Sequence, residues 1–244
     1  MPRASRYLCD GYTYHLTQRC HNRSFLLKFA CDRNAYRKWL WKAVKRYKVP
    51  VYGYCITSNH IHVIVHADKV ENIGKMMHLV TGASAQQYNI RKKREGSQWQ
   101  HPYQCTVVED GQHLLSCIRY VSMNMVRAGV VSDPSQWKWC GHDELTGQRS
   151  RYRILDIERL LESLRIDSAD DLYRIYASGI NEQLEKRDLK RRAEWTESLA
   201  VGNKAFVERI AFKYSGRRTF DYTSLDDSAC DTQWAVRESS PSYS

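Results

Sequence analysis

The chain has 244 residues, 42% of them hydrophobic, so it can bury the core of one large domain or of a domain with an appendage. Lys and Arg outnumber Asp and Glu by 38 to 27, and the net charge of +11 favours a polyanionic partner, nucleic acid or an acidic membrane surface, over a basic surface without a specific partner. No apolar leader and no run of 18 apolar residues occur, so we expect a cytoplasmic protein without a membrane span.

Seven secondary-structure elements are predicted before residue 143. The first strand alternates, with Tyr12, Tyr14 and Leu16 in one phase. Ser58-Asn59 separates two β-rich runs and predicts a tight hairpin between them. In chain order the elements follow as β-α-β-β-α-β-α, over residues 11–23, 32–48, 49–57, 60–66, 72–94, 103–110 and 112–129. This order predicts an α+β fold with a ferredoxin-like antiparallel sheet and one extra helix.

The sequence after residue 143 has a different composition. It shows helical spacing and no convincing strand, and the stretch from residue 221 onward is rich in Ser and Asp. We therefore expect a first domain over residues 1–142, a helical C-terminal extension over residues 143–220 and a flexible tail over residues 221–244. The eight cysteines contain no CxxC pair and no spacing of a zinc module, so we expect reduced, structural thiols.

The run SNHIHVIVHA (58–67) places two histidines in a strand. Because alternate side chains of a strand share a face, His60 and His62 lie together, and Ile61, Val63 and Val65 point to an apolar layer on the other face. Imidazole suits Zn, Mn, Cu, Fe and Ni as a ligand, whereas Mg usually prefers oxygen. The pattern therefore makes the two histidines candidate metal ligands.

The helix over residues 112–129 carries two stripes when it is projected at about 100° per residue. The core stripe contains Leu114, Ile118, Val121 and Met125. The polar stripe contains His113, Ser116, Tyr120, Asn124 and Arg127. Tyr120 and Asn124 are four residues apart, so their side chains lie one above the other. A phenol next to a carboxamide and a metal site is a candidate reaction centre.

Phosphoryl transfer is the chemistry that fits such a centre. A metal ion with three protein ligands keeps open positions for phosphate oxygens and orients the phosphate for in-line attack. The ordinary pKa of tyrosine is ~10, and a nearby cation favours the phenolate, which makes Tyr120 a candidate nucleophile. Attack would leave a phosphotyrosine and a free strand end, and a second hydroxyl could reseal the strand. The chemistry therefore supports reversible strand transfer as well as cleavage.

Several motifs resemble one family. SNHIHVIV resembles the His-hydrophobic-His signature of the HUH class of single-strand DNA nucleases. CIRYVSMNMVRAGVV resembles the nucleophile helix of the REP-associated tyrosine transposases, relatives of the single-tyrosine transposases of bacterial insertion sequences. YHLTQRCHNR and YGYCITSNHIHVIVH follow the order and spacing of that family, so the resemblance runs from about residue 6 to 142. Met125 replaces the family's common proline, and WQHPYQCTVVED replaces its usual basic segment before the fourth strand.

The resemblance implies an HUH domain that acts as a metal-dependent single-stranded DNA endonuclease and strand transferase. It implies Tyr120 as the nucleophile, Mg²⁺ or Mn²⁺ as the cofactor, and His60, His62 and Asn124 as the metal ligands. It also implies a 5′-phosphotyrosine intermediate, a palindromic repeat hairpin as the DNA partner, and a place at the nucleoid in the cytoplasm. The native metal, the recognised repeat and the choice between monomer and homodimer stay open.

Basic side chains outside this centre are candidates for DNA contact, although a solvated helix end is the alternative for the RKKR cluster. They flank the first strand, end the second helix or follow the nucleophile: Arg3, Arg6, Arg19, Arg23, Arg91, Lys92, Lys93, Arg94 and Arg127. The Lys186–Arg192 cluster of the C-terminal extension is a further candidate.

Three other functions compete with this interpretation. A histidine-triad nucleotide hydrolase needs a third histidine at the next in-phase position, which is Ile64. A zinc deaminase needs HxE and PCxxC motifs, which the sequence lacks. A non-catalytic DNA- or RNA-hairpin-binding protein, with His60 and His62 as ordinary sheet histidines, is the main alternative.

Overall fold

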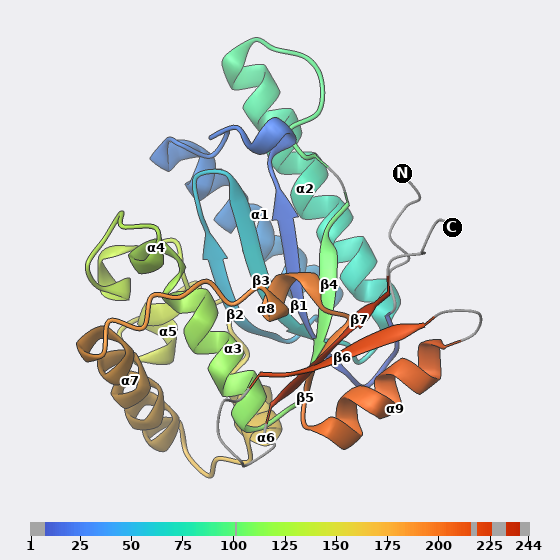
Figure 1. Ribbon diagram of the computed structural model, residues 1–244. Helices are drawn as coiled ribbons and strands as arrows, with labels where there is room; N and C mark the ends of the chain where they lie inside the picture. The colour runs from blue at the N-terminus through green and yellow to red at the C-terminus, as the bar shows by residue number, and fades with distance from the viewer. Residues whose placement is uncertain (1–7, 101, 216–218, 226–232, 240–244) are drawn as a thin grey trace.

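A seven-stranded sheet organises the computed structural model, which describes residues 8–100, 102–215, 219–225 and 233–239. The strands lie side by side in the order β2-β3-β1-β4-β5-β7-β6 (Figure 1). Neighbouring strands are antiparallel except for β4 and β5, which are parallel. The strands are β1 (Thr13–Arg19), β2 (Val51–Ile56), β3 (His60–His66), β4 (Gln104–Val108), β5 (Ala200–Gly202), β6 (Phe220–Ser224) and β7 (Trp234–Glu238).

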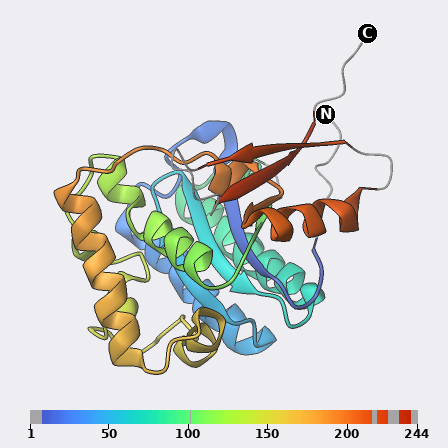
Figure 2. The ribbon, with the colours of Figure 1, turned by 60° about the horizontal axis from the view of Figure 1, so that its bottom comes forward.

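The first four strands form the predicted ferredoxin-like sheet. Helix α1 (Ala30–Tyr47) connects β1 to β2, and α2 (Val70–Lys92) connects β3 to β4, which gives a βαββαβ unit with strand order 2-3-1-4. The helices α1 and α2 pack together on one face of the sheet, and α3 (Gln112–Ser122) lies on the other face (Figures 1 and 2). The prediction of an α+β fold with a ferredoxin-like sheet and one extra helix is confirmed.

The two faces of β3 differ as its sequence predicts. Ile61, Val63 and Val65 are fully buried in the core on one face. On the other face, Ile64 lies in phase with His62, and a Cβ atom placed on Gly53 of β2 would be 3.2 Å from Ile64 Cδ1 and 3.7 Å from the Cγ1 atom of Ile118 in α3. The absence of a side chain at Gly53 therefore lets α3 approach the face that carries the histidines.

The predicted helix over residues 112–129 is interrupted. Its core stripe is buried as expected, with Leu114 0% and Val121 1% exposed. However, Met123 has φ −75° and ψ 1°, so α3 ends at Ser122 and the short α4 (Asn124–Arg127) follows. The break falls between Tyr120 and Asn124, yet the amide of Arg127 still donates to the carbonyl of Met123 and keeps the two turns together.

The C-terminal part contains strands as well as helices, which corrects two expectations. The sheet gains β5, β6 and β7 after residue 143, and β6 and β7 lie in the stretch predicted to be a flexible tail; residues 226–232 and 240–244 of that stretch lie outside the described residues. The sequence pattern that would predict these strands is weak, because β5 has three residues and four of the five residues of β6 are exposed. The remaining helices are α5 (His142–Leu145), α6 (Ile157–Leu164), α7 (Ala169–Glu185), α8 (Glu194–Glu197) and α9 (Lys204–Tyr214), with 3₁₀ turns η1 (His21–Arg23) and η2 (Pro134–Gln136).

In the part of the chain that the structure describes, no helix combines the length with the apolar character that a membrane crossing needs.

Candidate active site

The hairpin turn between β2 and β3 positions the first histidine. The amide of Thr57 donates to the carbonyl of His60 over 2.9 Å, which closes the predicted turn at Ser58-Asn59. His60 Nδ1 lies 2.7 Å from Asn59 Oδ1, and because a carboxamide oxygen only accepts, Nδ1 carries the proton. Burial, with Arg19 nearby, lowers the pKa of His60 to about 4. In the neutral ring the lone pair is therefore on Nε2.

The second histidine lies between two polar neighbours. His62 is 3% exposed, and its ring centroid is 4.8 Å from that of His60. His62 Nδ1 is 2.9 Å from His15 Nε2, and His62 Nε2 is 3.0 Å from Asn124 Nδ2. Burial, reinforced by the neighbouring histidines, holds the pKa of His62 well below its usual range. The structure thus brings three of the predicted residues, His60, His62 and Asn124, to one place.

Tyr120 adjoins this group from the last turn of α3. Its ring centroid is 6.4 Å from that of His62 and 6.5 Å from that of His15, and the side chain is 7% exposed. Within the described residues, the Tyr120 hydroxyl makes no hydrogen bond. Burial raises the pKa of Tyr120, and the positive charge of Arg127 acts against this rise.

Arg127 covers the face of the Tyr120 ring. Its guanidinium carbon is 3.9 Å from the ring centroid, and Nη1 donates to the Tyr120 carbonyl over 2.8 Å. Among the described residues, the buried Nη2 has no hydrogen-bond partner and Arg127 forms no ion pair. A buried guanidinium without a carboxylate is an unpaired charge, so this position favours an anionic ligand.

Two parts of the site were missed in the sequence. His15 is 1% exposed and lies on β1, whose even-numbered residues were recognised as the apolar phase. His15 therefore belongs to the other phase of β1, which faces α3, and this position in the sequence could have identified it as a residue of the site. The backbone carbonyl of Trp195, which lies 2.7 Å from His15 Nδ1, had no signal because its contact is 180 residues distant in sequence.

The donor atoms fit a divalent metal ion. His60 and His62 each have a neutral ring with a bare Nε2, and Asn124 contributes a carboxamide beside His62. In the described part of the chain, no group of three His, Cys, Asp or Glu side chains could hold a metal ion. The Asn124 carboxamide lies beside His62 Nε2, and its oxygen could serve as a third ligand if the amide were turned over, which would exchange Oδ1 and Nδ2.

The basic residues predicted to contact DNA have different surroundings. Arg19 is exposed and lies opposite His60 in the β1–β3 register, and Arg23 is exposed at the end of η1. Arg127 lies in the site, as described above. Arg3 and Arg6 lie outside the described residues.

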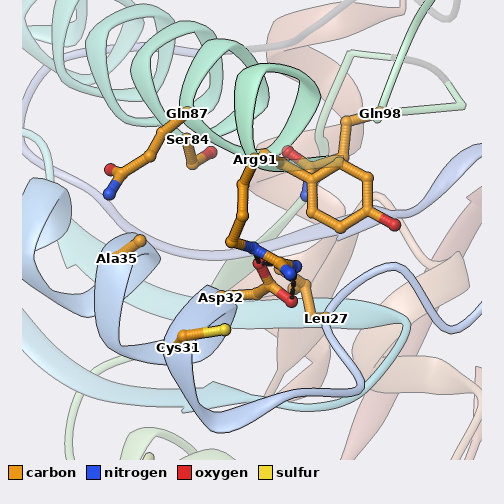
Figure 3. Close-up of a pocket in the computed structure, with 9 residues that line it drawn as sticks. Leu27, Cys31, Asp32, Ala35, Ser84, Gln87, Arg91 and Gln98 are labelled. Atoms are coloured by element: carbon orange, nitrogen blue, oxygen red, sulfur yellow. Dashed lines mark hydrogen bonds and ion pairs between the residues drawn. The ribbon is translucent and has the colours of Figure 1, made fainter. Parts of the chain in front are cut away.

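Arg91 is held in an ion pair. Its Nε donates to Asp32 Oδ1 over 3.0 Å and its Nη2 to Asp32 Oδ2 over 2.5 Å. Figure 3 shows this pair joining α2 to α1 beside a cavity of about 50 Å³. Since Asp32 is 5% exposed, Arg91 neutralises a buried carboxylate.

The other basic clusters are partly engaged. The Lys92 ammonium lies 4.6 Å from the centre of the Phe29 ring, Lys93 ends α2 in a left-handed conformation, and Arg94 lies 5.7 Å from the centre of the Tyr88 ring. In the extension, ion pairs join Lys186 to Glu182, Arg192 to Asp188 and Arg191 to Glu197.

Comparisons with known proteins bear on this arrangement. No curated protein matches the chain. The chain is similar to a solved structure of a REP-associated tyrosine transposase bound to a REP hairpin, with 18% sequence identity, a TM-score of 0.48, and coverage of 63% of this chain and 90% of that chain. Residues 9–124 match the family model for IS200-like transposases. This matched segment carries the histidine pair, Tyr120 and Asn124.

Proposed function

We propose that this chain is a metal-dependent single-stranded DNA endonuclease and strand transferase that acts at palindromic repeat hairpins. The observation that carries the proposal is the Tyr120 ring beside His62, whose Nε2 is 3.0 Å from Asn124 Nδ2. The match of residues 9–124 to the family model for IS200-like transposases supports the reaction class. The hairpin substrate rests on the resemblance of residues 117–131 to the REP-associated tyrosine transposases.

The Tyr120 oxygen is the nucleophile of the proposed reaction. It attacks the phosphorus of a phosphodiester, the new Tyr–O–P bond forms, and the bond from phosphorus to the 3′ oxygen of the upstream nucleotide breaks. The phenol proton passes to solvent, and the released 3′ oxygen takes up a proton. The 5′ phosphate stays on Tyr120, so that a 3′ hydroxyl can later reverse the step and join a strand.

His60, His62 and Asn124 would hold Mg²⁺ or Mn²⁺, which when bound supplies positive charge to the phosphate oxygens. The chain itself keeps both imidazoles neutral by burial and aims the bare Nε2 of each ring away from its Nδ1 hydrogen bond. The histidines therefore need no deprotonation before they bind the metal.

Arg127 is the proposed partner of the scissile phosphate on the side of Tyr120. The unpaired Nη2 supplies a buried donor, and the guanidinium over the ring lowers the cost of forming the phenolate. Arg127 thus assists both the Tyr120 oxygen, which attacks, and the scissile phosphate.

Covalent trapping tests the proposal. The full chain is incubated with a 5′-labelled and a 3′-labelled single-stranded hairpin DNA and Mn²⁺, and a denaturing gel detects the protein–DNA adduct. With the wild type we expect an adduct that carries the 3′ label and a released fragment that carries the 5′ label, because the 5′ phosphate stays on Tyr120. We expect no adduct with Tyr120→Phe, which keeps the ring but has no hydroxyl. Tyr88→Phe is the control, because Tyr88 lies in α2 and is 9% exposed, close to the burial of Tyr120.

Metal dependence is tested in the same assay. Excess EDTA and His60→Ala should each abolish the adduct while hairpin binding persists. Cleavage by Tyr120→Phe, or a nucleotide mapped to another tyrosine by mass spectrometry, would reject the assignment. Hairpin binding by the wild type without any adduct would instead identify a non-catalytic binding protein.

A further inference from the structure

We propose that His15 is a positioning residue that fixes the tautomer of His62 and that the backbone carbonyl of Trp195 sets its orientation. The proposal rests on the proposed function in one respect, since it takes His62 as a metal ligand. It adds that the C-terminal extension, through Trp195, contributes to the protonation state of the site.

The hydrogen bonds that run from the Trp195 carbonyl through His15 to His62 form a relay, which begins at the carbonyl. A carbonyl oxygen only accepts hydrogen bonds, and it lies 2.7 Å from His15 Nδ1, so Nδ1 carries a proton. His15 is 1% exposed, its charged neighbour is the cation of Arg127, and among the described residues no carboxylate bonds to it. A second proton would place an unpaired charge in the core, so the ring is neutral and its Nε2 is bare.

The second step passes from His15 to His62. The bare Nε2 of His15 can only accept, so across the 2.9 Å contact His62 Nδ1 is the donor. The two rings are 19° from parallel, with centroids 5.0 Å apart. His62 is neutral as well, and its lone pair is therefore on Nε2, the atom next to Asn124. This is the atom that a metal ligand must present.

The carbonyl is held in place by the sheet. The Trp195 side chain is 1% exposed and its ring is 6.3 Å from that of Tyr120. Just after it, Thr106 Oγ1 of β4 donates to the Ser198 carbonyl over 2.8 Å, and the amide of Val107 donates to the Leu199 carbonyl over 2.8 Å. Ser198 and Leu199 are thus fixed to β4, and α8, which contains Trp195, packs against β1 and β4.

Nuclear magnetic resonance of the metal-free, DNA-free protein tests the relay directly. Protonated and bare imidazole nitrogens have very different ¹⁵N shifts, so the spectrum of the full chain reports the tautomer of His62. We expect His62 to be protonated at Nδ1 in the wild type and in His15→Gln, whose amide offers one donor and one acceptor. In His15→Leu, which offers neither, we expect loss of the single tautomer.

Mn²⁺ titration by calorimetry gives a second readout. His15→Leu should weaken Mn²⁺ binding by roughly 10- to 100-fold, the range for partners of metal-ligating histidines, and His15→Gln should restore most of it. His66→Leu is the matched control, because His66 is a partly buried histidine of β3 that hydrogen-bonds Thr13 at the other end of the strand. Its Mn²⁺ affinity should equal that of the wild type.

Two results would overturn the inference: a wild-type His62 protonated at Nε2, or a folded His15→Leu protein with unchanged Mn²⁺ affinity. If His15→Leu fails to fold, the tautomer of His62 in the wild type and the Mn²⁺ titration of His15→Gln still test the proposal. A protein that makes no DNA adduct but shows the Nδ1 tautomer loses the proposed function and keeps the relay.

Discussion

His15 is a buried histidine that remains neutral in the folded protein, and this makes stability depend on pH. Burial lowers its pKa to about 4, from 6.5 in an exposed histidine. As the pH falls from 6.5 towards 4, the unfolded chain takes up a proton that the folded chain does not, so the free energy of unfolding decreases. On going from pH 7 to pH 5, we expect His15 alone to lower the free energy of unfolding by roughly 2 kcal/mol, which urea unfolding measures.

His15→Gln is the control for this pH dependence. Glutamine keeps a donor and an acceptor but does not titrate, so the loss of stability on going from pH 7 to pH 5 should be smaller by that amount. His62 contributes in the same direction in both proteins, because burial lowers its pKa too. Equal losses in the two proteins would show that His15 is not neutral in the folded state.

The residues of the site differ in how far the sequence reveals them. His60 and His62 are visible because a two-residue period places them on one face of a strand, and Tyr120 and Asn124 because a four-residue spacing places them together on a helix. The structure brings the strand pair and the helix pair together through the 3.0 Å contact between His62 and Asn124. The role of His15 depends on the pairing of β1 with β3 and on a carbonyl from the extension. Both are long-range contacts, which periodicity does not encode.

At the scale of elements, the short strand β5 joins the extension to the first sheet. Gly202 ends this strand, and a Cβ atom there would be 2.5 Å from Phe206 Cδ1 and 2.8 Å from Glu109 Cβ. We expect Gly202→Ala to reduce the free energy of unfolding by about 1–3 kcal/mol, since neither neighbour can withdraw without moving β4 or α9. Urea unfolding followed by tryptophan fluorescence measures the change.

The matched substitution is in α2. A Cβ atom on Gly82 meets no atom within 4 Å, and the residue lies in the interior of the helix. Gly82→Ala should therefore raise the free energy of unfolding by roughly 0.5–1 kcal/mol through reduced backbone entropy. A stabilised Gly202→Ala protein would mean that β5 is packed more loosely than its contacts indicate.

The elements of the first half are more predictable than those of the second. The helices α1 and α2 have buried residues at helical spacing, and the strands β1 to β4 are buried over most of their length. In contrast, β5 is too short for a period, and β6 has a mostly exposed pattern that resembles a loop. The break at Met123 has no marker such as glycine or proline inside the helix. Packing between distant segments determines these features.

At the scale of the whole molecule, the net charge of +11 predicts that DNA binding depends strongly on salt. Each phosphate contact to a single strand adds about −0.7 to the slope of log affinity against log salt, so about five contacts give a slope near −3.5. Fluorescence anisotropy with a labelled hairpin at several salt concentrations measures this slope. A binding affinity that is independent of salt would contradict an electrostatic interface.

Single substitutions identify the contributing cations. Arg19 is exposed next to the histidine pair, so Arg19→Gln should make the slope shallower by about 0.7. Lys186→Gln is the control, because Lys186 is exposed and already pairs with Glu182. Its slope should match that of the wild type.

The distance in sequence between His15 and Trp195 has a consequence for biosynthesis. The two residues are 180 positions apart, and at about 5–20 residues per second a ribosome needs roughly 10 to 40 s to add that stretch. Over the last part of this interval, after Asn124 has been added, the nascent chain contains both histidines, Tyr120 and Asn124, while the carbonyl that orients His15 has not been made. Translation products that stop after residue 124 and before residue 195 therefore contain every side chain of the proposed site and lack the carbonyl that orients His15.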